Sequence, residues 1–248
     1  MDRLAQYAIV TAYYKEDEAT IRRCITSVAA QGASCEHFLV ADGHPQAWLA
    51  SQAIRHIVLD RAHGDFGNTP RGVGALLAIC EGFDGFCFLD ADNWLEPSHL
   101  ADCIAAASSI EDCDLVRTGR TFRRPDGSLL PVAEDRDSDF TDTNCFFFLP
   151  GSYHLTHHFA IAPREFAPIG DRIFSRALKR ANLREAAVGH ATVNYSCGWA
   201  SAYHALGETP PDGAKPNIDA SPIWGWLATR DRRELEIISR RSGVKLPE

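Results

Sequence analysis

The sequence predicts an α/β protein, with a single domain whose mostly parallel central sheet is flanked by helices. Up to about residue 110, short β-branched and aromatic runs alternate with helical stripes of apolar residues. Such alternation is typical of right-handed βαβ units around a parallel sheet. One run, 86–89 (FCFL), is apolar throughout, as a strand covered on both faces should be. The 248 residues, 45% of them hydrophobic, suffice for one large core.

The first elements are a strand, a helix and two further strands. Residues 7–14 (YAIVTAYY) are β-branched and aromatic and predict a strand. Asp17 then opens a helix that ends near Gln31. Its buried face is predicted by an i, i+3, i+4, i+7 repeat of Ile21, Cys24, Ile25 and Val28. Strands over 37–41 (HFLVA) and 56–59 follow.

Two more helices flank the apolar strand 86–89. A polar loop over 63–71 precedes the first of them, whose predicted buried stripe is Val73, Leu76, Leu77 and Cys80. After the strand, Pro97 suits the first turn of the second helix. The predicted stripe of this helix is Leu100, Cys103, Ile104 and Ala107.

The second half of the chain has a different pattern, with strands, a hairpin and fewer helical stripes. In order, it predicts a strand over 114–118, a hairpin over 122–132 turning at Pro125-Asp126-Gly127, a strand over 145–149 and a helix over 171–182. The proline-rich stretch 207–222 predicts a long loop. Asp231 and Glu234 form a capping-box pattern for a final helix that reaches Arg241.

Composition and charge exclude several classes of protein. With 25 basic and 33 acidic residues the formal charge is −8, which disfavours general binding to nucleic acid phosphates. No stretch approaches the roughly 18 apolar residues of a transmembrane segment, and the first residues lack a signal-peptide core. We therefore expect a cytoplasmic protein. The eight cysteines contain no CxxC pair, and we interpret them as reduced core residues, with Cys24, Cys80 and Cys103 on apolar helical stripes.

Acidic residues follow several predicted strands, and Asp90-Ala91-Asp92 directly after FCFL is the sharpest case. In an open parallel sheet, ligands bind beyond the carboxyl ends of the strands. Two carboxylates at such an edge are hard ligands for Mg²⁺ or Mn²⁺, which keep positions open for substrate phosphates. The structural alternative is that this pair caps the following helix or forms a solvated turn.

Four further residues are candidates for ligand binding. Asp42 is placed to accept a hydrogen bond from a nucleobase or ribose, although Asp-Gly also forms ordinary turns. Arg71 stands at a predicted helix start, where a cation and free amides favour an anion; a surface arginine is the alternative. Asp65 belongs to the same loop, and a solvated turn explains it equally well. Tyr13 is either a base-stacking or a core residue.

In order and spacing, these segments resemble glycosyltransferase family 2, a superfamily of inverting GT-A enzymes. Residues 11–31 (TAYYKEDEATIRRCITSVAAQ) resemble its opening strand and helix with the Ser-Val-x-x-Gln signature. VADGHP (40–45) resembles its Asp-Asp-Gly-Ser element, and DFGNTPRGVGA (65–75) its Asn/Gly/Arg loop. FLDADNWLEP (88–97) resembles its Leu-Asp-x-Asp segment. The likeness is good over about 7–110 and looser beyond.

The resemblance implies a GT-A fold with a nucleotide-sugar-binding half, 1–110, and an acceptor-side half, 111–248, in one compact domain. It implies that Asp42 contacts the base and that Asp90 and Asp92 serve ribose, metal and diphosphate. Thr11, Tyr13, Asp65 and Arg71 complete the expected nucleotide-sugar set. The candidate catalytic base is Asp171. The sequence departs from the family pattern at three positions, with Thr11 for proline, Ala41 for aspartate and Gly170 for glutamate.

The resemblance also implies a function, the transfer of a sugar from a nucleotide-diphosphate donor to a hydroxyl acceptor. The expected cofactor is Mn²⁺ or Mg²⁺, held by Asp90, Asp92 and, as a third ligand, His204. The loop 207–222, with Lys215, is either a lid over the donor or a static connector. Two alternatives stay open, a non-catalytic nucleotide-sugar or carbohydrate binding module and a phosphatase of the haloacid dehalogenase type with Asp90 as nucleophile.

Overall fold

The computed structural model describes residues 4–32, 34–132 and 140–246. Within these ranges the core is an eight-stranded sheet of order β3-β2-β1-β4-β7-β6-β8-β5. Its first four strands, β1 (Tyr7–Tyr13), β2 (Cys35–Ala41), β3 (Arg55–Val58) and β4 (Gly85–Phe88), pair in parallel. The predicted parallel core is therefore confirmed, and the carboxyl ends of these strands share one edge.

The other strands make the sheet mixed. β7 (Phe146–Phe148) pairs antiparallel with both β4 and β6 (Leu115–Arg123), and β8 (Glu185–Ser196) runs parallel to β6. The two-residue β5 (Trp94–Leu95), which the sequence did not predict, pairs antiparallel with β8. This pairing fixes the chain just after Asp92.

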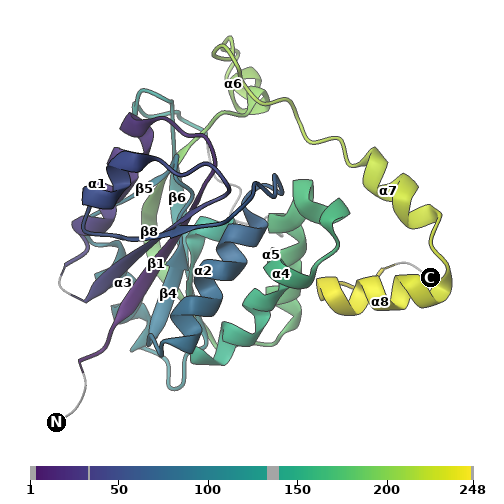
Figure 1. The fold of residues 1–248 in the computed structure, drawn as a ribbon, viewed down its shortest axis with the longest axis horizontal. Coiled ribbons are helices and arrows are strands. Elements are labelled where there is room, and N and C mark those ends of the chain that lie inside the picture. The colour runs from purple at the N-terminus through teal and green to yellow at the C-terminus, as the bar shows by residue number, and fades with distance from the viewer. Residues whose placement is uncertain (1–3, 33, 133–139, 247–248) are drawn as a thin grey trace.

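Helices cover both faces of the sheet (Figure 1). α1 (Glu18–Ala29) and α3 (His99–Ala107) pack on one face, where Cys24 and Cys103 meet Ile9 and Cys87 of the strands. On the other face lie α2 (Asn68–Cys80), α4 (His158–Ile161) and α5 (Gly170–Arg180). Successive strand residues point to opposite faces, so β4 contributes to both cores.

The predicted buried stripe of α2 is confirmed only at Leu77, which packs against the core, while Val73 is half-buried. Leu76 is 60% exposed and Cys80 is also exposed, whereas the buried positions are Pro70, Gly72, Gly74, Ala75 and Ala78. A Cβ atom at Gly74 would lie 2.3 Å from Val10 Cγ1. The helix backbone approaches the sheet so closely that only small residues fit beneath it. On this helix the small residues are therefore buried, and the large Leu76 is exposed.

The capping predictions for α1 and α8 are confirmed. Asp17 accepts a hydrogen bond from the Thr20 amide at the start of α1. Asp231 and Glu234 form the reciprocal capping box of α8 (Arg232–Ser242). The turn at Pro125-Asp126-Gly127 is also present, since Gly127 N donates to the Arg124 carbonyl at 2.8 Å. Of the eight free cysteines, five are buried.

Short helices fill the second half of the chain. They are the α-helices α6 (Ala200–Ala205) and α7 (Ser221–Ala228) and the 3-10 segments η2 (Thr143–Cys145), η3 (Pro150–His157) and η4 (Arg164–Ile169). A further 3-10 segment, η1 (Ala47–Ser51), lies between β2 and β3. α7 and α8 pack against η4 and α5 through an apolar cluster that includes Phe166 and Ile223. Within the described residues, no helix combines the length and apolar character needed to cross a bilayer.

Candidate functional site

A cleft of about 440 Å³ lies at the carboxyl edge of the parallel strands. Its walls come from the ends of β1, β2 and β4, from the start of α2 and from the start of α5. The sequence-predicted residues that line it are Tyr13, Asp42, Arg71, Asp90, Asp92 and Asp171. The fold thus brings together six residues from five separate segments of the sequence.

Asp90 is held on both carboxylate oxygens. Arg71 forms an ion pair with Oδ1, and Asn144 Nδ2 donates to Oδ2 at 3.0 Å. The Asp90 amide in turn donates to Asn144 Oδ1 at 2.5 Å. Burial alone would raise the pKa of Asp90, but the Arg71 charge and the Asn144 hydrogen bond outweigh it and lower this pKa. Asp90 is therefore an anion with its hydrogen bonds already made.

Asp92 differs from Asp90 both in its partners and in the direction of its pKa shift. No ion pair joins its carboxylate to another described residue. Burial and the nearby Asp90 charge raise its pKa to about 7, and the positive charge of Lys215 opposes them. Its backbone, by contrast, is fixed, because Arg23 Nη2 donates to the Asp92 carbonyl at 3.1 Å. The Arg23 guanidinium also stacks over the Trp94 ring, 3.9 Å from the centroid.

A second buried carboxylate, Asp142, lies close to Asp90, and the sequence did not predict it. Asp142 forms an ion pair with Arg120 and accepts a hydrogen bond of 2.6 Å from Asn144 Nδ2. Asn144 therefore bridges Asp90 and Asp142. The only signal in the sequence is the polar TDTN segment before CFFFL, and nothing in it indicates that β7 pairs next to β4.

Asp42 and Tyr13 form the end of the cleft at β1 and β2. Asp42 is buried; its oxygens accept hydrogen bonds from the His63 amide at 2.8 Å and the Gly64 amide at 3.0 Å. Burial opposes ionisation, but these bonds prevail and lower the pKa of Asp42. The Tyr13 hydroxyl lies 2.7 Å from His56 Nε2, so this tyrosine is largely a core residue that exposes one edge.

Asp171 stands in the first turn of α5, where the helix dipole favours an ionised carboxylate. Burial and the neighbouring Asp142 charge nevertheless raise its pKa, against the opposing Arg172 amide and Arg71 charge. The residue before Asp171 is Gly170, and the Asn68 side chain lies close to its Cα atom. A Cβ atom at Gly170 would lie 2.9 Å from Asn68 Nδ2, so this asparagine occupies the space of any larger side chain.

Three predicted site residues do not reach the cleft. Thr11 is fully buried, and its hydroxyl lies 2.8 Å from His37 Nε2. Asp65 accepts hydrogen bonds from the amide and hydroxyl of Thr69, at 3.0 and 2.6 Å, and lines a separate pocket. His204 lies exposed on α6, outside the cleft lining. Thr11 and Asp65 thus serve local structure here.

The long loop after α6 contributes Lys215 and Ile218 to the cleft. Lys215 N donates to the Gly198 carbonyl at 2.6 Å, and Ala200 N donates to the Lys215 carbonyl at 2.9 Å. Lys215 Nζ lies 5.8 Å from the centre of the Trp199 ring, which also lines the cleft. The loop is therefore anchored at the cleft on the side of Asp92.

The residues of the cleft fit a divalent cation whose coordination is completed by a bound ligand. No group of three histidine, cysteine or carboxylate side chains gathers as a metal centre within the described ranges. Arg71 and Asn144 occupy part of the acceptor capacity of Asp90, whose side chain still lines the cleft, and Asp92 is the carboxylate beside it without a described ion pair. Mg²⁺ is often bound through one or two carboxylates together with substrate phosphates. A site completed by a bound diphosphate is consistent with this donor set.

Comparisons with known proteins agree with this fold. The family model described as glycosyl transferase family 2 matches residues 8–167. Crystal structures of S. aureus TarS 1-349 are similar. The complex with UDP has a TM-score of 0.60 and 15% identity, and covers 81% of this chain. The complex with UDP-GlcNAc has a TM-score of 0.62 and 12% identity, and covers 95% of this chain and 71% of TarS 1-349.

This chain spans 63% of the TarS chain in the UDP complex. No curated protein matches the sequence. The structural likeness confirms the expected GT-A fold, and the family model covers more than half of the 248 residues. The chain belongs to glycosyl transferase family 2.

Proposed function

We propose that this protein transfers a glycosyl group from a nucleoside-diphosphate donor to a hydroxyl acceptor, with inversion at the anomeric carbon. One observation carries the proposal. Five of the predicted donor-binding residues and the predicted base line a single cleft, together with the cations Arg71 and Lys215. Because the similar TarS structures were solved with UDP and UDP-GlcNAc, uridine nucleotides are the first donors to test.

The proposed roles follow from charge and position. Asp42 receives the base, and Arg71 and Lys215 stabilise the negative charge that gathers on the departing diphosphate. Asp92 would hold a divalent cation together with the diphosphate, and a bound cation would add electrostatic stabilisation of the same leaving group. Residues 1–110 would thus carry the donor and 111–248 the acceptor side.

Asp171 is the proposed general base. It accepts the proton of the acceptor hydroxyl as the oxygen attacks the anomeric carbon and the bond to the diphosphate breaks. A raised pKa favours this role, since a more basic carboxylate takes a proton more readily at neutral pH. A single displacement of this kind inverts the anomeric configuration.

Calorimetry with UDP and UDP-GlcNAc, with and without Mn²⁺, tests the donor side. We expect binding that Mn²⁺ strengthens, and Asp171→Asn should retain it while losing transfer or donor hydrolysis. Proton NMR of the early product should show the inverted anomer. If no nucleotide binds in either condition, the proposal fails. If the wild type binds donors but never turns them over, the alternative of a non-catalytic binding module is favoured.

A further inference from the structure

A second, smaller cavity of about 160 Å³ adjoins the cleft and lies outside the proposed donor site. Asn68 and Ala167 line both cavities and therefore mark the place where the two spaces meet. Two consecutive residues at the start of α5 face the two spaces, Gly170 the small pocket and Asp171 the cleft. The pocket is thus placed directly beside the proposed base.

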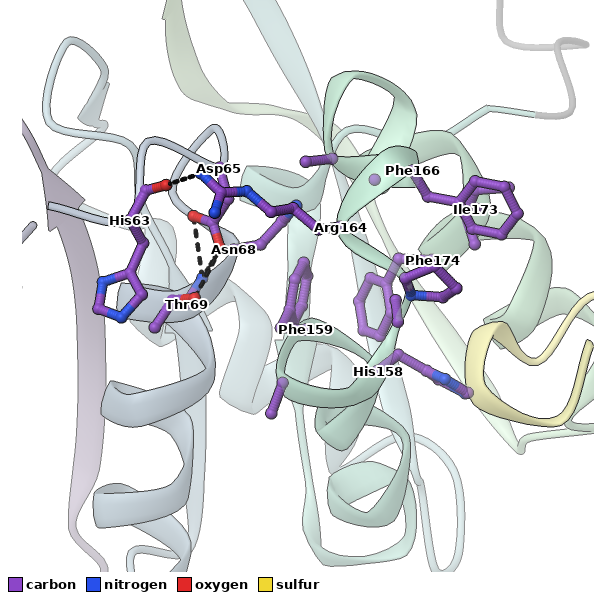
Figure 2. A pocket seen from close by; sticks show the side chains of 15 residues that line it. His63, Asp65, Asn68, Thr69, His158, Phe159, Arg164, Phe166, Ile173 and Phe174 are labelled. Carbon is purple, nitrogen blue, oxygen red and sulfur yellow. Dashed lines mark hydrogen bonds between the residues drawn. The ribbon is translucent and has the colours of Figure 1, made fainter. Parts of the chain in front are cut away.

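The floor of this side pocket is aromatic (Figure 2). Four buried apolar side chains from α4, η4 and α5 supply it: Phe159, Phe166, Ile173 and Phe174. The Phe159 and Phe174 ring centroids lie 4.4 Å apart. Such a floor favours an apolar group and offers no hydrogen bonds to sugar hydroxyls.

The polar groups around the pocket are already engaged with protein atoms. Asp65 is bonded to the amide and hydroxyl of Thr69. Arg164 reaches across from η4, and its Nη2 donates to the His63 carbonyl at 2.6 Å, as Figure 2 shows. These bonds hold the two walls together. Among the described lining residues, Asp65 and Arg164 thus both have protein partners and do not call for an ionic ligand.

The volume sets the size of the occupant. An apolar cavity of about 150 Å³ is large enough to hold benzene. The side pocket therefore suits one six-membered ring and is too small for two fused rings.

We propose that this pocket is an acceptor subsite, which takes an uncharged aromatic ring attached to the hydroxyl that Asp171 deprotonates. This inference rests on the proposed function, because it places the acceptor on the α5 side of the cleft. With the ring against Phe159 and Phe174, its substituent passes Asn68 and Ala167 to reach Asp171. The structure thereby assigns a substrate class: aryl-bearing alcohols over fully polar ones.

Titration of the 248-residue protein with benzyl alcohol, monitored by saturation-transfer NMR, tests the subsite. Ala162 lines only the small pocket and is partly exposed, so Ala162→Leu should fill the space without unfolding the chain. We expect at least about tenfold weaker binding in this variant, since the ring loses apolar contacts worth about 1.4 kcal/mol or more. Ala105→Leu, on the exposed face of α3, is the matched control and should bind as wild type does.

Two comparisons use the wild type alone and do not depend on any variant folding. Methyl glucoside and 1-naphthalenemethanol should both bind far more weakly than benzyl alcohol, the first for lack of polar partners and the second by size. A crystal soaked in benzyl alcohol should show the ring among Phe159, Phe166 and Phe174 with its hydroxyl directed to Asp171.

UDP binding, measured on the same samples, separates the two proposals. If the wild type does not bind UDP, the proposed function is overturned. The benzyl alcohol titration tests the pocket separately. Equal benzyl alcohol binding in wild type and Ala162→Leu, no binding in either, or density for the ring outside the pocket would overturn the acceptor subsite.

Discussion

No described ion pair neutralises the charge of Asp92, and this has a measurable effect on stability. Its pKa in the folded protein is about 7, against an ordinary value of 3.8. Between these values the folded state holds a proton that the unfolded state has lost. The free energy of unfolding therefore falls as the pH rises from about 4 to about 7.

The size of the effect follows from the same pKa. A rise from 3.8 to about 7 corresponds to a ceiling of about 4.4 kcal/mol, at about 1.4 kcal/mol for each pH unit. Because Asp92 lines an open cleft and is only partly buried, we take about half of this, about 2 kcal/mol. The variant Asp92→Asn keeps the shape and removes the titration. At pH 8 it should be more stable than the wild type by this amount, which raises Tm by about 4–8 °C.

Urea unfolding of both proteins in EDTA, at pH 5, 6, 7 and 8, measures the difference. The gap between Asp92→Asn and wild type should widen up to pH 7 and then level off. Asp42→Asn is a control of opposite sign, because the pKa of Asp42 is lowered and its charged form stabilises the fold above pH 4. The reasoning is refuted if Asp92→Asn is no more stable at pH 8, or if its gain is the same at every pH.

Three further substitutions test other parts of the structure. Asn144→Ala should lose about 1–3 kcal/mol in urea unfolding, because the two carboxylates that it bridges lose a buried donor; unchanged stability would contradict the bridge. Arg23→Met should raise the donor KM several-fold while Arg23→Lys recovers only part, since the guanidinium fixes the Asp92 carbonyl; an unchanged KM would rule this out. Gly74→Ala should cost about 1–3 kcal/mol through its clash with the sheet, whereas Gly225→Ala, with open space around it, should be near neutral in the same thermal scans.

The sequence predicted the strands and helices of the first half because their signals are local. Period-2 and period-3.6 patterns and capping residues such as Asp17 and Asp231 act over a few neighbours. The motif spacing likewise placed Asp42, Arg71 and Asp90 at the same sheet edge, since parallel strands align their carboxyl ends. The small-residue face of α2 was missed, because a close approach to the sheet inverts the relation between side-chain size and burial.

What the sequence by itself determined was the α/β core, its edge and the residue types that meet there. The tertiary structure alone decided the partners and the pKa of each of them. Two carboxylates only two positions apart, Asp90 and Asp92, differ because Asn144 and Arg71 reach one and not the other. The placement of Asn144 depends on β7 pairing with β4 across more than fifty residues of chain, and no local pattern in the sequence encodes that contact.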